Sequence, residues 1–268
     1  MAERMTATER QLDTADLTER VKGMYQEVAL HPDREFHFET GRPLAERLGY
    51  PDADLDRIPA AAIDSFAGVG YFLDLAAIVP GEAVLDLGSG SGTDSFLAAL
   101  AAGDAGSVIG VDMTAEQLTK ATDLAANAGI ASAEFREGQI EDPPVEPGSV
   151  DCVISNGVIN LSPDKAAVFA AAATALRPGG RLAIADIVSA RQLPEGVTCD
   201  ASLWAACIGG AMQRDLYRET IEGAGFEILK LGENERYRFI SDRADNATRK
   251  YGVVSISLLA RRRQKESK

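Results

Sequence analysis

The chain contains few of the residues that form covalent or metal-bound frameworks. Among its 268 residues are three cysteines, Cys152, Cys199 and Cys207, and two histidines, His31 and His37. Three cysteines cannot make the paired framework that stabilises small secreted domains, so we expect free thiols in a reducing compartment. No resident metal ion is predicted.

Long hydrophobic runs are also missing. No apolar run approaches the ~18 residues that are needed to cross a bilayer. The first twenty residues, MAERMTATERQLDTADLTER, are charged and have no apolar core. A secretory signal is therefore not expected, and we predict a cytoplasmic protein without a membrane partner.

Basic side chains are outnumbered by acidic ones. The chain has 27 Lys and Arg against 41 Asp and Glu, which gives a formal charge of −14. Such a charge repels phosphate backbones, so nucleic acid is not expected as a partner. The sequence leaves the oligomeric state open.

The most informative feature that is present is a glycine turn. The apolar run 84–87 stops at Gly88, Gly90 and Gly92, and a helix-like segment follows. Glycine can adopt positive φ and lets the backbone approach a ligand, while free N–H groups at the start of the next helix face that ligand. A second apolar run ends at Asp112, twenty positions after Gly92. A carboxylate at this spacing can accept hydrogen bonds from both hydroxyls of an adenosine ribose, so the turn is predicted to bind a nucleotide.

The order of apolar and polar segments predicts an α/β fold. Residues 80–190 alternate short apolar strands with helices, the pattern of a parallel sheet covered on both faces. Residues 1–79 are mostly helical by pattern and are expected to form an N-terminal lid. A cofactor-binding domain is expected over 80–268, with a helical insertion at about 191–224 and two strands after it.

Several polar residues are predicted to cap helices. Asp13 or Asp16 can begin a helix that runs to about Leu30. Thr114 and Gln117 form a capping box that begins a helix after the second strand, and Ser162, before a proline, is expected to cap another.

Four motifs in order resemble those of the class I S-adenosylmethionine-dependent methyltransferases. They are Val84–Asp94, Gly138–Asp142, Val150–Asn156 and Leu176–Leu182. The resemblance covers about residues 80–190. It implies a doubly wound, Rossmann-like sheet of seven strands that is mostly parallel and ends in an antiparallel hairpin. It also implies S-adenosylmethionine as the cofactor.

The resemblance assigns roles around the methionine part of that cofactor. Gly88, Gly90 and Gly92 would let the chain approach it, with Asp86 beneath the turn, and Asn156 would lie near the sulfonium. Asp86 can equally be structural.

On the adenosine side, the resemblance assigns the ribose hydroxyls to Asp112. Met113 would pack beside the adenine, and Ile140 and Glu141 would bound the ring, with Glu141 facing its amino group. Met113 can equally fill the core, and Glu141 can belong to an acidic turn before two prolines.

The flanking segments are similar to the arsenite methyltransferases. The similar segments are Leu48–Asp52, Asp112–Thr114, Ser155–Leu161 and Cys207–Ala211. In that family, cysteine thiolates hold trivalent arsenic, a soft centre that prefers sulfur. Two of the cysteine positions carry Val69 and Gly157 here, and Cys207 keeps its place. Cys199 can supply a second sulfur, so the resemblance makes Cys207, Cys199 and Asn156 the catalytic candidates.

Other functions remain open at this point. Cys199 and Cys207 can be packing residues, and the acceptor can be a small organic metabolite. Its pocket would have aromatic and apolar walls from Tyr25, Tyr71, Phe72, Trp204, Met212 and Tyr237, and His31 or His37 as a base. A noncatalytic protein that binds the cofactor, or a nicotinamide dehydrogenase, is a further alternative.

Overall fold

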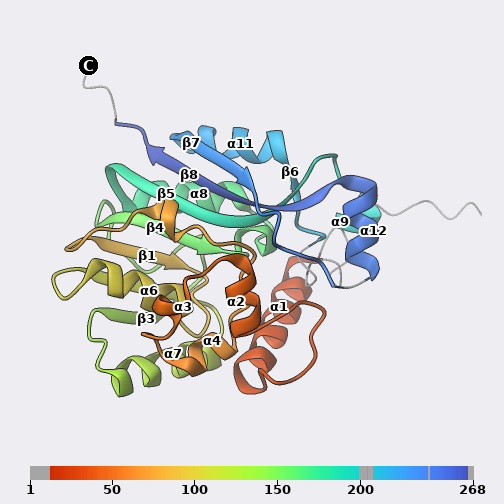
Figure 1. Cartoon of the computed structure of the whole chain (residues 1–268). Helices are drawn as coiled ribbons and strands as arrows, with labels where there is room; N and C mark the ends of the chain where they lie inside the picture. Colours follow the sequence, from red (N-terminus) through yellow and green to blue (C-terminus); the bar gives the residue numbers. More distant parts are fainter. Residues whose placement is uncertain (1–12, 199–203, 205–207, 241, 265–268) are drawn as a thin grey trace, which may run out of the picture.

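A mixed sheet forms the centre of the computed structural model, which describes residues 13–198, 204, 208–240 and 242–264. The sheet has eight strands in the order β3-β2-β1-β4-β5-β8-β7, and β6 pairs with β5 (Figure 1). The strands are β1 Ala83–Leu87, β2 Ser107–Asp112, β3 Ala133–Glu137, β4 Val150–Asn156, β5 Leu176–Ser189, β6 Met212–Gln213, β7 Phe226–Glu233 and β8 Val253–Arg262.

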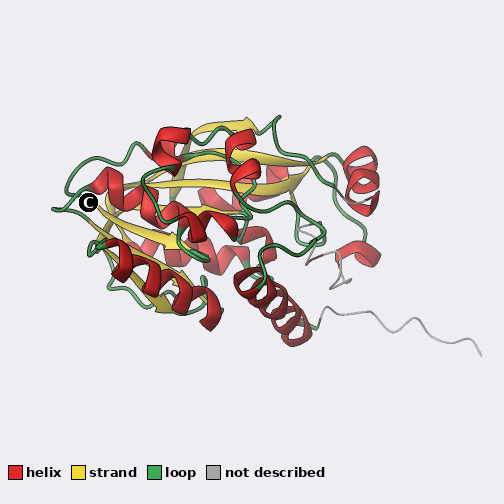
Figure 2. Ribbon diagram, turned by 60° about the horizontal axis from the view of Figure 1, so that its bottom comes forward, coloured by secondary structure: helices red, strands yellow, loops and turns green. Residues whose placement is uncertain are grey.

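Helices flank the sheet on both sides (Figure 2). Before β1 lie α1 Thr14–Leu30, α2 Arg42–Leu48, α3 Asp52–Leu55, α4 Ala60–Asp64 and α5 Leu73–Ala76. Between and after the strands lie α6 Thr93–Ala102, α7 Ala115–Ala128, the short 3₁₀ helix η1 Ile159–Leu161, α8 Lys165–Ala175, α9 Glu195–Thr198, α11 Arg214–Gly223 and α12 Asp242–Tyr251. No helix in the described ranges is long and apolar enough to cross a membrane.

The predicted sheet is confirmed, with one short strand added. Strands β1 to β5 pair in parallel, whereas β8 runs antiparallel to both β5 and β7. The additional strand is β6, which has two residues. The last two long strands are separated by α12, a helix that the sequence analysis missed. Its residues are mostly polar, so they carry little apolar pattern.

The central strands are apolar because helices cover both their faces. In β5 every residue from Leu182 to Ser189 is buried, and β4 is buried from Cys152 to Ser155. A strand covered on both sides reads as a continuous apolar run rather than an alternating one. This pattern is why the central strands were recognisable from the sequence.

The predicted helix caps are confirmed in part: Asp13 and Thr114 precede their helices as predicted, whereas Ser162 does not cap α8. Asp13 does cap α1, since its side chain accepts from two backbone N–H groups of the first turn. Thr114 precedes α7 but makes no side-chain capping bond. Helix α8 is capped by Asp164, which accepts from the N–H of Ala167, and not by Ser162. The hydroxyl of Ser162 instead faces the pocket described below.

Candidate functional site

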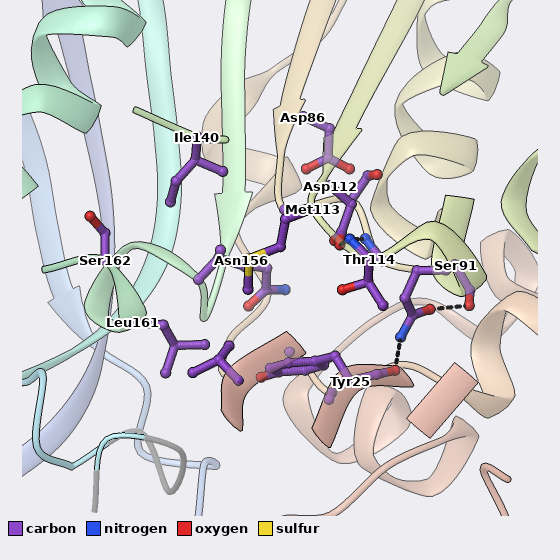
Figure 3. Close-up of a pocket in the computed structure, with 18 of the residues that line it drawn as sticks. Tyr25, Asp86, Ser91, Asp112, Met113, Thr114, Ile140, Asn156, Leu161 and Ser162 are labelled. Carbon is purple, nitrogen blue, oxygen red and sulfur yellow. Dashed lines mark hydrogen bonds between the residues drawn. The ribbon is translucent and has the colours of Figure 1, made fainter. Parts of the chain in front are cut away.

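A pocket lies at the carboxyl ends of β1, β2 and β4, where the strand order changes direction and ligands of open α/β sheets bind (Figure 3). Most of the residues proposed from the sequence line it: Asp86, Gly88, Gly90, Asp112, Met113, Ile140, Glu141 and Asn156. Residues far apart in the chain therefore surround one cavity.

Gly92 has a different place from the other two glycines of the turn. It adopts φ +94° as the residue before α6, and its N–H donates to Ser89 O at 2.9 Å. A Cβ at this position would lie 2.9 Å from ring atoms of both Phe135 and Phe96. Gly92 is thus required by packing behind the turn, and it is not among the residues that line the pocket.

Asp112 at the end of β2 holds the glycine turn in place. Its Oδ2 accepts from Gly90 N–H at 2.9 Å, and its Oδ1 accepts from Thr114 N–H at 2.9 Å. Burial raises the pKa of the carboxyl, and the two backbone donors oppose that rise. A carboxylate offers about four lone-pair sites. Each oxygen can therefore accept a further bond from a ligand in the pocket.

A buried polar cluster at the end of β4 was not found from the sequence. Tyr50 Oη donates to Asp94 Oδ1 at 2.6 Å, and Asn156 Nδ2 donates to Asp94 Oδ2 at 2.9 Å. The same amide nitrogen lies 3.1 Å from Gly70 O, while Asn156 Oδ1 accepts from Val69 N–H at 2.8 Å. The cluster ties the N-terminal segment to β4 and α6. It also places the Asp94 carboxylate in the wall of the pocket.

Two further carboxyl groups in this wall, besides Asp112, have raised pKa values. Burial, with the neighbouring charges of Asp94 and Asp112 added, raises the pKa of Asp86 to about 8, although Ser95 donates to it. Burial raises the pKa of Asp94 to about 6, against the stabilising bonds from Tyr50 and Asn156. The wall of the pocket therefore contains several neighbouring carboxyl groups, and ionising all of them together is unfavourable.

The raised pKa of Asp86 predicts a loss of stability as pH rises. In the unfolded chain this carboxyl ionises near its ordinary pKa of 3.8, whereas in the folded protein it keeps its proton to about pH 8. Between these values the folded state binds the extra proton, so the free energy of unfolding decreases with increasing pH. We expect the ligand-free melting temperature to fall by several degrees between pH 5 and pH 9. Asp86→Asn should flatten this curve when both are measured by scanning calorimetry, and an equally steep curve in the variant would contradict the assignment.

Glu141 is fixed by a residue that the sequence assigned to helix capping. Ser162 Oγ donates to Glu141 Oε1, and Asp164 N–H donates to the same hydroxyl at 3.1 Å. Ile140 and Ser162 lie along one side of the pocket (Figure 3), and Glu141, bonded to Ser162, also lines the cavity. The use of Ser162 at the pocket explains why it does not cap α8.

Helix α1 forms part of the pocket wall. Its residues Leu17, Val21 and Tyr25 line the cavity. Gln117 Nε2 donates to the carbonyl of Tyr25 at 2.9 Å, and Gln117 Oε1 accepts from Ser91 Oγ (Figure 3). This one side chain therefore links helix α1 to the glycine turn, which is why it does not complete a capping box with Thr114.

Several candidates lie elsewhere. Neither histidine lines the pocket, and both are exposed. Of the proposed aromatic wall, Tyr25 lines the pocket and Phe72 is buried in the core. Cys152 is fully buried in β4, and burial raises its thiol pKa to about 12. Cys199 and Cys207 lie outside the described residues.

Val69 and Gly157 meet beside the polar cluster. Gly157 adopts φ +72°, and a Cβ built on it would lie 3.0 Å from Val69 Cγ1 and 3.8 Å from Val69 Cβ. These are the two positions where the sequence analysis found valine and glycine in place of cysteine. The fold brings them into contact.

Known proteins similar to this chain agree with the architecture. Residues 78–225 match a family described as a methyltransferase domain. An arsenite methyltransferase of Halobacterium salinarum is 43% identical over 226 residues, which cover 84% of this chain and 57% of that protein. Another, of Aquipseudomonas alcaligenes, is 42% identical over 173 residues, covering 62% of this chain and 50% of that protein. The chain thus spans about half the length of these curated relatives.

This chain is also similar to a protein of known structure. The crystal structure of an arsenic(III) S-adenosylmethionine methyltransferase from Chlamydomonas reinhardtii has a TM-score of 0.67 and 31% sequence identity. The match covers 81% of this chain and 74% of that one.

Proposed function

We propose a function for this chain from one premise: it belongs to the S-adenosylmethionine-dependent methyltransferase family. The proposed reaction is transfer of a methyl group from S-adenosylmethionine to trivalent arsenic, which is presented by thiols. The activity named for the arsenite methyltransferase relatives supports this acceptor, and the pocket described above supports the cofactor.

The observation that supports binding of S-adenosylmethionine is the set of polar groups that line one cavity. Asp112 keeps lone pairs free for ribose hydroxyls, and Glu141 lies along the side proposed for adenine. The hydroxyl of Ser89 lines the same cavity, and it is buried without a hydrogen-bond partner among the described residues. A buried polar atom without a partner is costly unless a ligand satisfies it. The residues present therefore fit a polar nucleoside.

The chain's own contribution to the reaction would be binding, alignment and exclusion of water. A bound sulfonium supplies an activated methyl group, so little acid–base chemistry is required of the protein. The glycine turn and Asp112 would hold the nucleoside at one end, and the polar cluster of Tyr50, Asp94 and Asn156 would shape the other. Helix α1 would keep water from the reacting atoms. When the methyl donor is already activated, alignment of the reactants and exclusion of water each contribute strongly to the rate of transfer.

Cofactor choice can be tested by thermal shift. S-adenosylhomocysteine, the product of methyl transfer, should raise the melting temperature by several degrees at saturating concentration, because a ligand of the folded state stabilises it by mass action. NAD should leave the melting temperature unchanged. A shift with NAD alone would favour the dehydrogenase alternative and contradict the proposal.

The acceptor is tested directly with methyl-labelled cofactor. The protein is incubated with labelled S-adenosylmethionine, arsenite and a monothiol such as glutathione, and the arsenic species are separated. Label in methylated arsenic supports the proposal. Label that appears only when a cell extract of small metabolites replaces arsenite would contradict it.

A small organic acceptor is the second candidate, and the contact between Val69 and Gly157 favours it. That contact places an apolar surface at positions that hold cysteine in the arsenite methyltransferases, and only one cysteine of the set, Cys207, keeps its place. Loss of soft ligands weakens the case for arsenic, since sulfur is the donor that arsenic prefers.

The same contact gives a gain-of-function prediction. The separation of 3.8 Å between the two Cβ positions is short enough for two reduced cysteine side chains to reach one shared atom. Val69→Cys combined with Gly157→Cys should therefore create a pair of thiols that can bind one arsenic atom. We expect arsenite to bind at least about tenfold tighter than in the parent protein, because each added thiolate is a preferred donor.

Calorimetry with arsenite in the presence of a monothiol measures this gain. The matched control is Val69→Ser with Gly157→Ser, which has the same shape and positive φ strain but oxygen in place of sulfur. Equal arsenite affinity in the cysteine and serine pairs would show that the two positions do not form an arsenic site.

A further inference from the structure

Lys165 at the start of α8 is a buried cation that the proposed reaction does not use. Its side chain is only 5% exposed. The ammonium group donates to Asn160 O at 3.0 Å and to Ser162 O at 2.9 Å, and it lies 4.9 Å from the centroid of the Trp204 ring. A desolvated ammonium ion over an aromatic face is attracted by the ring, and most strongly by tryptophan. The cation therefore joins Trp204 to the backbone around η1.

One of the two carbonyls that bind Lys165, that of Ser162, belongs to a residue in the wall of the cofactor pocket. Leu161 and Ser162 both line the cavity, and Ser162 is the residue that donates to Glu141. A movement of Lys165 would therefore displace Ser162, whose hydroxyl binds Glu141.

Trp204 contacts described residues that precede it and that follow it in the sequence. Its indole N–H donates to Thr198 O at 2.5 Å. A Cβ at Gly209 would lie 2.3 Å from Trp204 Cδ1, and one at Gly210 would lie 1.8 Å from Asn160 O. Glycine is required at both positions because the backbone passes directly against the indole and η1.

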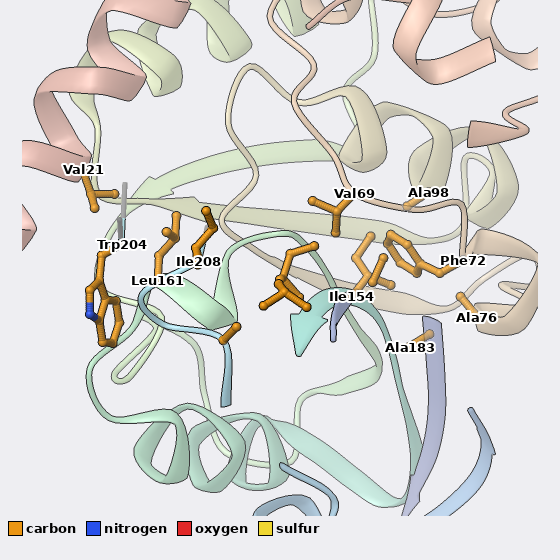
Figure 4. Packing of buried hydrophobic residues seen from close by; sticks show 14 of the residues in the cluster. Val21, Val69, Phe72, Ala76, Ala98, Ile154, Leu161, Ala183, Trp204 and Ile208 are labelled. Carbon is orange, nitrogen blue, oxygen red and sulfur yellow. The ribbon is translucent and has the colours of Figure 1, made fainter. Parts of the chain in front are cut away.

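The indole also belongs to the apolar cluster under helix α1. Trp204 and Ile208 are in one buried cluster with Val21 and Leu161, two residues that line the pocket (Figure 4). The indole therefore packs in the same buried cluster as two residues of the pocket wall.

We infer that Lys165 is a positioning residue: its ammonium group holds Trp204, and with it the flanking Thr198 and Gly209, against the wall of the cofactor pocket. The inference rests on the proposed function only in taking this wall of the cofactor pocket as the side on which the acceptor binds. Burial lowers the pKa of Lys165 to about 8, against the opposing charges of Asp186 and Glu141.

The first test uses Trp204 as its own reporter. It is the only tryptophan in the chain, so intrinsic fluorescence reports on this position alone. Lys165→Met keeps the length of the side chain and removes the charge, while Lys165→Arg keeps a cation. We expect Lys165→Met to red-shift the emission and to increase quenching by acrylamide about twofold or more, since the ring loses its cation and packs less tightly. Lys165→Arg should stay near the parent values.

Unchanged emission and quenching in a folded Lys165→Met protein would overturn the inference. Folding is checked by circular dichroism and by binding of S-adenosylhomocysteine. Equal changes in Lys165→Met and Lys165→Arg would also overturn it, because they would mean that shape and not charge holds the ring.

Kinetics test the positioning role separately. The KM for the acceptor should rise about tenfold in Lys165→Met, with the affinity for S-adenosylhomocysteine within about twofold of the parent, because alignment of the acceptor is lost while the nucleoside contacts remain. If the parent does not methylate arsenite but the fluorescence results hold, the proposed acceptor fails and the role of Lys165 stands. A large loss of S-adenosylhomocysteine affinity with unchanged acceptor KM would contradict the role.

A pH titration covers the case in which Lys165→Met does not fold. The ionisable groups that face Lys165 are Asp186 from β5, with Tyr217 of α11 bonded to it, and Glu141 from the loop after β3. In the parent protein, Trp204 emission should shift as pH rises through about 8. In Lys165→Arg this transition should be absent because a guanidinium keeps its charge. The same transition in both proteins, or none in the parent, would overturn the inference.

Discussion

Asp112→Ala is expected to lower the affinity for S-adenosylhomocysteine by at least about 100-fold. A hydrogen bond to a charged group contributes about 1.5–3 kcal/mol, and two such bonds to ribose hydroxyls would account for a loss of this size. The carboxylate has a second role, since it accepts from the N–H groups of Gly90 and Thr114. Its removal therefore also loosens the turn that shapes the pocket, which adds to the loss.

Titration calorimetry at a temperature well below the melting transition separates binding from unfolding. Asp123→Ala is the matched control, because Asp123 is exposed on α7 and its removal changes the net charge by the same amount. We expect that control to bind within about twofold of the parent, as surface charges contribute little. Affinity in Asp112→Ala that matches the control would refute the ribose assignment, and with it the orientation of the nucleoside in the pocket.

The sequence predicted those residues of the site that directly follow an apolar strand in the chain. The glycines of the turn and Asp112 follow directly from two apolar strands, so their position at one end of the sheet could be inferred from spacing. The parallel strands were equally visible because they are apolar throughout. Gly92 shows the limit of this reasoning. It belongs to the same motif, yet its glycine is required by Phe96 and Phe135 on the far side of the turn.

The part that could not be predicted depends on contacts between distant residues. Asp94 was visible only as the acid after the third glycine, and its partners Tyr50 and Asn156 lie 44 and 62 positions away in the sequence. One signal was available: an acid in the first turn of an otherwise apolar helix is expensive to bury unless other groups bond to it. The sequence gives no means of identifying those groups.

Ser162 and Gln117 illustrate a second reason. Both belong to segments with good capping patterns, and both were predicted to serve helix starts. In the structure their side chains bond to Glu141, Ser91 and Tyr25 around the pocket instead. Local propensity was outweighed by polar groups that the pocket must satisfy, as happens where a site is built into a fold.

Cys207→Ser is expected to lower methyl transfer to arsenite by at least about 100-fold and to leave S-adenosylhomocysteine affinity unchanged. The reason is the softness of the donor: trivalent arsenic prefers sulfur, and a hydroxyl oxygen is a poor substitute. Cys207 is the one cysteine that keeps its place in the resemblance to arsenite methyltransferases. With Val69 and Gly157 at two of the other positions, few thiols remain to replace it. Activity is measured with labelled cofactor, arsenite and a monothiol.

Cys152→Ala is the matched control for this loss. Cys152 is fully buried in β4, and its raised thiol pKa of about 12 keeps it protonated. The thiolate is the form that binds soft metals, so the control should retain the parent activity. Cys199→Ser separates the remaining possibilities, since a loss as large as that of Cys207→Ser would mean that both thiols bind the arsenic. Full arsenite methylation in Cys207→Ser would remove the thiol role that the resemblance implies. The apolar contact of Val69 with Gly157 would then be the better guide to the acceptor, which would be sought among small organic molecules.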